Sequence, residues 1–302
     1  KTINMPNQKK AYIFALLAVM CWSTVATAFK IALNNASFIQ LLFFSSFVSM
    51  LVLFLILVLQ KKLILLRLID VKQILISLGL GILNPFLYYV ILFKAYSILP
   101  AQEAMTLNYT WPVMLILLSI PLLKQKLSLK SSLAVMLSFI GIIIISTKAN
   151  LLNFKFSDFG GDMLALSSSV VWALYWLFNV KDSNDSVVKL FFNFLSGSLL
   201  SFLLMFFTEG LHVQSAAIPA FIYIGIFEMS LTFVFWLTAL KYASSTDKVS
   251  QLIFLSPFMS LFFIYLIIGE EIHYSTLIGL FFIVTGIIVQ QFIKSKPQNI
   301  QN

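Results

Sequence analysis

Long apolar runs separated by short polar segments extend along almost the whole chain. Ten runs are about 20 residues long, the length that a helix rising about 1.5 Å per residue needs to cross roughly 30 Å of hydrocarbon. The runs cover residues 11–33, 38–59, 73–93, 101–123, 132–147, 161–180, 187–207, 217–239, 245–268 and 275–293. The pattern therefore predicts an all-α integral membrane protein with ten transmembrane helices.

The composition agrees with this pattern. Of the 302 residues, 60% are hydrophobic and 10% are charged, which leaves too little polar surface to cover a water-soluble globule. The first run contains Lys30 and lacks a small-residue cleavage pattern, so we expect it to remain as the first helix rather than to be removed as a signal peptide. The single cysteine, Cys21, excludes an intrachain disulfide and a cysteine-based metal site, and we expect no metal and no cofactor.

The net charge of +9 indicates membrane topology rather than nucleic-acid binding, because the basic residues are spread over several loops. With the N-terminus in the cytoplasm, sixteen basic residues fall in cytoplasmic segments: Lys1, Lys9, Lys10, Lys61, Lys62, Arg67, Lys72, Lys124, Lys126, Lys130, Lys181, Lys189, Lys241, Lys248, Lys294 and Lys296. The outer loops hold only Lys148 and Lys155, and Lys30 and Lys94 lie near outer helix ends. We expect both termini inside, in the cytoplasmic membrane, with the lipid bilayer and a small-molecule substrate as partners and no nucleic acid.

The two halves of the chain repeat one plan. A shift of about 145 positions brings Pro257 onto Pro112 and repeats the surrounding landmarks. We therefore predict two five-helix repeats, residues 1–150 and 151–302. Because five is an odd number, the second repeat must enter the membrane with the opposite orientation, which is the inverted-repeat arrangement of secondary transporters.

Glycines and one aspartate suggest local roles in this plan. Gly141 and Gly286 occupy matched positions in the fifth and tenth runs, where small residues permit close helix contact, either inside the bundle or between the two protomers of a homodimer. Asp162 lies near the start of the sixth run, where the helix dipole favours a carboxylate, and we interpret it as a helix cap.

Two glutamates lie within the apolar runs. Glu228 is close to the centre of run 217–239, where a carboxyl group is costly unless it is protonated, paired or facing water, and it is a candidate to bind a cation or to carry a proton. The alternative is a structural glutamic acid bonded to a neighbouring helix. Thr232 follows one turn later on the same face. Glu103, near the outer end of run 101–123, is a second candidate for proton coupling, or a wet interfacial residue.

The third run contains residues that loosen a helix. Two glycines and Pro85 predict a kink near Ile82, because proline removes one helical hydrogen bond and sterically prevents another. Kinked helices frequently line the site in transporters. Asn84 and Tyr88, four residues apart, share a face of this helix and are either site residues or packing contacts.

Aromatic residues with polar neighbours lie near the middle of several runs. Asn108 and Trp111 are three residues apart, and Trp172 and Tyr175 lie away from the interfaces that lipid-facing aromatic residues prefer. They form either a ligand-facing wall or a packing surface between helices. The predicted substrate-binding residues are Trp22, Asn84, Tyr88, Asn108, Trp111, Trp172, Tyr175, Trp176, Glu228, Thr232 and Trp236, and the predicted proton-coupling residues are Glu228 and Glu103.

Short motifs in the second half carry a family resemblance. They are "ALKYASS" at 239–245, "LSP" at 255–257, "GE" at 269–270 and "IG" at 278–279 before "TGIIV". With them the chain resembles the EamA family of the drug/metabolite transporter superfamily. The first half departs from the family's Leu-Gly-Glu with Leu-Lys-Gln, as a loop on the cytoplasmic side would, and "LNYTWP" at 107–112 looks like the fourth helix of the branch with aromatic amino-acid exporters. The resemblance implies a central cavity between the halves, reached alternately from each side.

Several functions are compatible with these observations. The leading hypothesis is a secondary transporter that exports small amphipathic metabolites, amino acids among them, by alternating access. The chain has no GxxxxGK[ST] pattern, so we do not expect ATP to be the direct energy source. The rival is a carrier for uptake of organic cations such as quaternary amines. We do not expect an enzyme, since His212 and His273 have no metal-ligand spacing and no nucleophile motif accompanies them. A structural or sensor protein is a further alternative.

Overall fold

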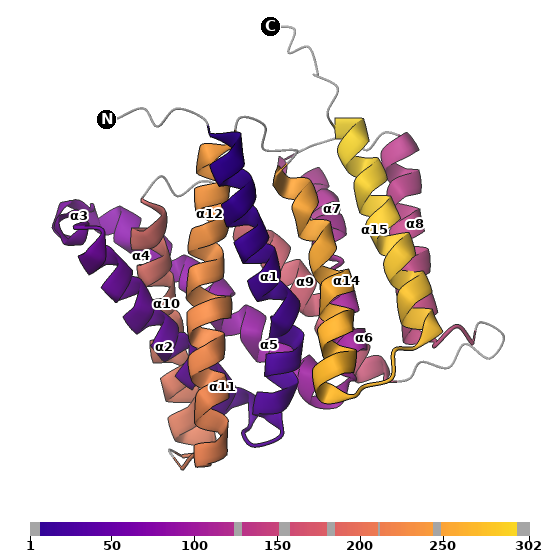
Figure 1. Ribbon diagram of the computed structural model, residues 1–302. Helices are drawn as coiled ribbons and strands as arrows, with labels where there is room; N and C mark the ends of the chain where they lie inside the picture. Colours follow the sequence, from indigo (N-terminus) through magenta and orange to yellow (C-terminus); the bar gives the residue numbers. More distant parts are fainter. Residues whose placement is uncertain are drawn as a thin grey trace, which may run out of the picture.

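The computed structural model describes residues 7–123, 129–150, 158–179, 185–210, 212–243 and 249–294. Within these ranges the regular secondary structure is helical and contains no strand, which confirms the all-α prediction (Figure 1). Nine helical stretches of the described part are long and apolar enough to cross a membrane. A tenth helix begins at Tyr274, and its apolar segment Tyr274–Gln290 is shorter than the other nine, so the predicted count of ten corresponds to nine full spans and one shorter apolar segment.

The first half forms five of these stretches, close to the predicted runs. Three of them are single helices: α1 (Gln8–Leu33), α2 (Phe38–Leu59) and α8 (Leu129–Ser146). The third stretch consists of α4 (Val71–Gly81), η1 (Ile82–Leu87) and α5 (Tyr88–Ile98), and the fourth of α6 (Ala101–Asn108) and α7 (Trp111–Leu123). A short helix, α3 (Leu63–Leu68), connects α2 to α4.

The second half follows the same order. Its single helices are α9 (Phe159–Asn179), α10 (Ser186–Thr208) and α15 (Tyr274–Lys294). Its third stretch consists of η2 (Ser215–Ala217), α11 (Ile218–Tyr223), η3 (Ile224–Leu231) and α12 (Thr232–Tyr242), and its fourth of η4 (Gln251–Phe254), α14 (Leu255–Phe263) and η5 (Ile264–Ile268).

Polar side chains determine where several helices begin. Ser37 and Asp185 accept hydrogen bonds from backbone N–H groups in the first turns of α2 and α10. At α9 this role belongs to Asp158, whose Oδ1 accepts a hydrogen bond from the Gly161 N–H at 2.8 Å. The interpretation of Asp162 as the cap is therefore wrong, because the helix begins three residues earlier and Asp162 lies inside its first turn.

Two stretches in each half are interrupted. η1 is a π-helical turn that begins at Ile82, and Asn84 within it leaves the helical conformation beside Pro85, which confirms the predicted kink. The fourth stretch breaks after Asn108, since the ring of Pro112 excludes the carbonyl group four residues before it. The second half has a π-helical turn, η3, and the 3₁₀ turn η4 at the corresponding places.

The helices pack as one bundle around α1, which contacts α12 and α14 (Figure 1). α10 packs on α2 and α4, α9 packs on α5 and α7, and α8 pairs with α15 at one edge of the bundle. α1 begins and α15 ends at the same end of the bundle, the upper end in Figure 1. We call this end the N-terminal side, and by the charge pattern it is the predicted cytoplasmic side. Some of the basic residues used for that prediction lie outside the described residues: Lys1, Lys124, Lys126, Lys155, Lys181, Lys248 and Lys296.

Glycines bring α8 and α15 into close contact within the chain. A Cβ atom on Gly141 would lie 2.4 Å from the carbonyl oxygen of Gly279. A Cβ atom on Gly286 would lie 2.5 Å from the carbonyl oxygen of Ala134. Both distances are too short for any side chain, so these glycines serve helix packing inside the bundle, one of the two roles expected for them.

Candidate functional site

A cavity of about 630 Å³ lies in the middle of the bundle, between helices of both halves. The first half contributes residues of α1, α5, α6 and α7 to its wall, and the second half contributes residues of α9, η3, α12, η4 and α15. The cavity extends towards the N-terminal side, where Leu240, Ser250 and Gln290 line it. Its position between the halves makes it the candidate substrate site.

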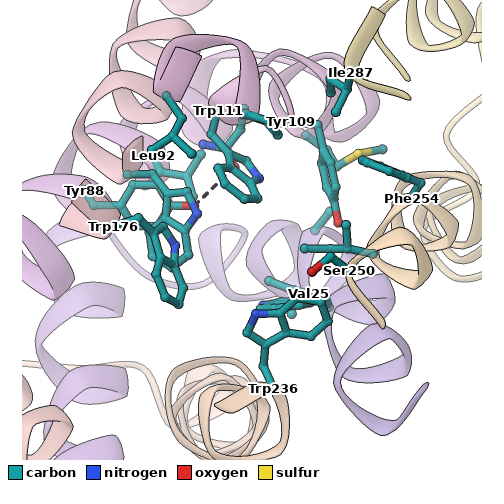
Figure 2. Close-up of a pocket in the computed structure, with 18 of the residues that line it drawn as sticks. Val25, Tyr88, Leu92, Tyr109, Trp111, Trp176, Trp236, Ser250, Phe254 and Ile287 are labelled. Carbon is teal, nitrogen blue, oxygen red and sulfur yellow. Dashed lines mark hydrogen bonds between the residues drawn. The ribbon is translucent and has the colours of Figure 1, made fainter. Parts of the chain in front are cut away.

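Aromatic side chains form much of the wall. The chain has five tryptophans, and all of them line this cavity: Trp22, Trp111, Trp172, Trp176 and Trp236. The ring centroids of Trp22 and Trp236 are 5.4 Å apart, and those of Trp172 and Trp176 are 5.9 Å apart in an edge-to-face arrangement. In Figure 2, Trp111 and Trp236 project towards one open space from opposite sides. Ring contacts of this kind add about 0.5–1.5 kcal/mol to burial, so the wall is a preformed aromatic surface.

Glu228 places a carboxyl group in this wall. It lies in the π-helical turn η3, and its side chain is 6% exposed. The Tyr89 hydroxyl donates a hydrogen bond to Oε1 of Glu228 at 2.9 Å, while Oε2 has no hydrogen-bond partner among the described residues. One carboxyl oxygen is thus held in place and the other is left for a ligand or a proton.

A chain of hydrogen bonds holds the neighbouring part of the wall. The Tyr88 hydroxyl donates to Oδ1 of Asn108 at 3.2 Å, and Nδ2 of Asn108 donates to the Ser168 hydroxyl at 2.8 Å. These bonds join α5, α6 and α9 and fix the orientation of the Asn108 amide. The Tyr88 ring also packs on that of Trp172, with centroids 4.6 Å apart. Tyr88 and Asn108 therefore shape the wall with their polar groups already paired.

The wall has few ionisable side chains. Among the described residues that line the cavity, Glu228 is the only carboxylate, and none is lysine, arginine or histidine. The Trp176 indole N–H and Oε1 of Gln290 are buried and have no partner in the described part of the chain. The cavity thus combines a largely aromatic wall with a single carboxyl group among its described residues.

Most of the residues that the sequence suggested for the substrate site line this cavity. They are Trp22, Tyr88, Asn108, Trp111, Trp172, Trp176, Glu228 and Trp236. Three others do not. The Tyr175 hydroxyl pairs with the amide of Asn193 on α10 at 3.0 Å, and the Thr232 hydroxyl donates to the carbonyl of Phe227 inside η3. Asn84 is wholly buried within η1.

Glu103, the second proton-coupling candidate, lies away from the cavity. It is buried in the first turn of α6, at the end of the bundle opposite to the N-terminal side. There its carboxyl group interacts with that of Asp162, in the first turn of α9. The two glutamates that stood out in the sequence therefore occupy different regions of the bundle.

Sequence reasoning left out several residues of the wall. Tyr109 lines the cavity from the break between α6 and α7, and Pro112, which causes that break, is the signal that could have identified it. Figure 2 shows Tyr109 facing the open space, on the flank opposite to Tyr88. Phe29 and Tyr96 also line the cavity. They gave no signal, because an aromatic residue in an apolar helix is usually a packing residue.

At the end opposite to the N-terminal side, hydrogen bonds join the two halves. The Glu270 carboxylate, in the connection between η5 and α15, accepts hydrogen bonds from the backbone N–H groups of Ala101 at 2.9 Å and Gln102 at 3.1 Å. These N–H groups belong to the first turn of α6, where the helix dipole stabilises a negative charge. Glu270 thereby attaches the second half to the start of α6.

The Gln102 side chain adds three bonds to this contact. Its Nε2 donates to the Glu271 carbonyl at 2.7 Å, and its Oε1 accepts from the His273 N–H and from the Thr276 hydroxyl, both at 2.8 Å. We call the bonds of residues 101–102 with Glu270, Glu271, His273 and Thr276 the latch. None of these residues lines the cavity, so the latch joins the halves on the side where the cavity is closed.

A lysine strengthens the same end. Lys30 Nζ donates to the carbonyl oxygens of Tyr96 at 2.8 Å and Leu99 at 2.5 Å, so α1 is attached to the end of α5. This places the ammonium group where it pairs with carbonyl groups at the C-terminal end of a helix. Lys30 therefore stabilises the closed end rather than serving as a counter-ion inside the cavity.

Comparisons with known proteins agree with this architecture. Residues 9–147 and 159–290 match the model of the EamA-like transporter family. An uncharacterized transporter of Clostridium kluyveri is 26% identical over 97% of this chain and 96% of its own length, and the uncharacterized transporter YoaV of Bacillus subtilis is 23% identical over 95% and 98%. A crystal structure that is 19% identical over 95% of this chain and 98% of its own superimposes with a TM-score of 0.67, a likeness of fold.

Proposed function

Because the chain belongs to the EamA-like transporter family, we propose that this membrane transporter is a secondary carrier that exports small amphipathic metabolites through the central cavity. The family assignment supports transport, and the cavity wall supports the choice of substrate. The lack of an ATP-binding motif supports a carrier driven by an ion gradient or by the gradient of the substrate itself.

The observation that carries the substrate class is the combination of five tryptophans with a single carboxylate and no basic side chain among the described wall residues. Indole rings attract cations through their π-electrons, by about 0.5–2 kcal/mol for each contact, and Glu228 supplies the matching negative charge. An anionic substrate would meet this carboxylate and no positively charged side chain among the described wall residues. The wall therefore supports amines and organic cations with an apolar or aromatic group over zwitterionic amino acids and anions.

The same carboxyl group supports coupling to protons. Oε2 of Glu228 has no partner in the described part of the chain, so it can hold either a proton or the ammonium group of a substrate, and the two compete for one position. Release of a substrate cation on one side then allows a proton to bind there. Export of the cation in exchange for an entering proton follows from this competition, and Glu103 remains a second candidate for the proton path.

Three compounds that share the indole ring and differ in net charge test the substrate class. We would measure the thermal stabilisation of the purified protein by tryptamine, tryptophan and indole-3-propionate, and the efflux of radiolabelled tryptamine from proteoliposomes with and without a pH gradient. Tryptamine should stabilise the protein most and indole-3-propionate least, and Glu228→Gln should remove this order. Equal stabilisation by the anion, or the same order in wild type and Glu228→Gln, would contradict the proposal.

A further inference from the structure

The third stretches of the two halves correspond residue by residue. A shift of 144 positions carries Val71–Ile98 onto Ser215–Tyr242. Each stretch is interrupted by a π-helical turn, η1 in the first half and η3 in the second. The same shift carries Asn84, in η1, onto Glu228, in η3. The buried amide and the buried carboxyl group are therefore equivalent positions of the two repeats.

The packing of these stretches has the same symmetry. A Cβ atom on Gly81 would meet Asn193 and Ser196 of α10, while a Cβ atom on Gly225, its equivalent, would meet Ser45 and Val48 of α2. The third stretch of each half thus packs through a matched glycine on the second helix of the other half. Because of this cross-packing, the conformation of each third stretch depends on the second helix of the other half.

The two equivalent side chains nevertheless have different surroundings. Glu228 lines the cavity and is bonded to Tyr89, whereas Asn84 is 0% exposed and does not line it. Neither Nδ2 nor Oδ1 of Asn84 has a hydrogen-bond partner among the described residues. A buried amide without partners is costly, so the position of Asn84 calls for an explanation.

We infer that Asn84 is the substrate contact of the state in which the cavity opens on the side of the latch, where it takes the place that Glu228 has in the present state. This inference rests on the proposed function, since it needs two states of one carrier. When equivalent stretches exchange conformations, η1 turns position 84 towards the cavity, and η3 withdraws Glu228 once a proton has replaced the substrate cation on its carboxyl group. The substrate cation then faces a neutral amide instead of a carboxylate, and its binding is weaker on the latch side. Such an asymmetry favours release there, which is the direction of export.

Thiol labelling tests the exposure of position 84. In a Cys21→Ser background, which has no other cysteine, Asn84→Cys should react with a membrane-impermeant maleimide added outside intact cells, and tryptamine should slow the reaction. Ser97→Cys, exposed at the latch end, is the positive control, and Ser198→Cys, buried in α10, is the negative control. Weakening the latch with Gln102→Ala should raise the reaction rate of Asn84→Cys about tenfold or more. An Asn84→Cys protein that stays unreactive while Ser97→Cys reacts would overturn the inference.

A second variant keeps the inference testable if Asn84→Cys does not fold. Asn84→Asp should increase the potency of external tryptamine as an inhibitor of tryptamine efflux about tenfold, because a charge-assisted hydrogen bond replaces a neutral one. Unchanged potency would contradict the contact. The labelling needs no substrate, so reaction of Asn84→Cys without any tryptamine binding would overturn the substrate class and leave the exposure of position 84 standing. Tryptamine efflux that depends on Glu228, without labelling of Asn84→Cys, would overturn the role of Asn84 and leave the substrate class standing.

Discussion

Replacement of Gln102 by alanine should loosen the closed end of the bundle. The wild-type side chain is wholly buried and makes three hydrogen bonds, all of them to residues of the other half. A neutral hydrogen bond contributes about 0.5–1.5 kcal/mol net, so the loss of three weakens the contact by about 1.5–4.5 kcal/mol. Since about 1.4 kcal/mol corresponds to a factor of ten, the opening equilibrium of the latch should rise roughly 10- to 1000-fold.

Hydrogen exchange measured by mass spectrometry, on protein in lipid nanodiscs, detects this opening of the latch directly. The His273 N–H loses its acceptor in Gln102→Ala and should exchange faster. The N–H groups of Ala101 and residue 102 keep their acceptor, Glu270, and should also exchange faster if the latch opens as a unit. Ser97→Ala is the control, because among the described residues the Ser97 hydroxyl donates to the Lys94 carbonyl of its own helix.

The two groups of amides separate a local effect from opening of the closed end. Faster exchange at His273 alone would mean that the Gln102 side chain protects one amide without holding the halves together. In that case Glu270 alone would hold the start of α6. Unchanged exchange at both places would refute the assignment of Gln102 to the latch.

Two further predictions concern stability, measured by thermal unfolding of purified protein. Gly141→Ala should lower the unfolding temperature, because its Cβ atom would lie 2.4 Å from a carbonyl oxygen and overpacking costs about 1–3 kcal/mol; Gly79→Ala, also in a helix but with nothing within 4 Å, should leave it unchanged or raise it. Lys62→Ala and Asp185→Ala both remove a partly exposed ion pair of 2.7 Å, worth about 0–1 kcal/mol, but Asp185→Ala also removes the cap of α10 and should cost about 0.5–2 kcal/mol more. Equal shifts within either pair would contradict the corresponding contact.

The helices were predictable because a lipid bilayer requires long apolar segments whose backbone N–H and C=O groups are hydrogen-bonded within the segment. The second run was predicted as 38–59, and α2 is Phe38–Leu59. Prolines also marked the breaks: Pro85 lies in η1, and Pro112 follows the end of α6. η3 has no proline within it, so its π-helical turn had no such signal and emerged only from the packing of the repeats.

The rotation of each helix was the part that sequence spacing could not determine. Tyr175 was grouped with Trp172, three residues before it, but it faces α10 while Trp172 faces the cavity. Thr232 was placed on the face of Glu228 by a spacing of four, but the π-helical turn between them offered the carbonyl of Phe227 to its hydroxyl. A spacing of three or four residues defines a shared face only in a regular helix.

The latch was beyond sequence analysis for a different reason. Gln102 belongs to the first half and its partners to the second, about 170 positions later. A glutamine at a helix start has no feature that distinguishes it from an exposed residue. Only the arrangement of the helices brings it to the connection before α15 and buries it there.

The gathering of all five tryptophans in one cavity makes the protein its own optical probe. Ultraviolet emission of a folded protein comes mainly from indole rings, and here every indole borders the same space. Entry of a non-fluorescent compound, exchange of water for an apolar group, or a change in the shape of the cavity would alter the whole emission signal rather than a fraction of it. Titrations and stopped-flow measurements of occupancy can therefore be made on the unlabelled wild-type chain.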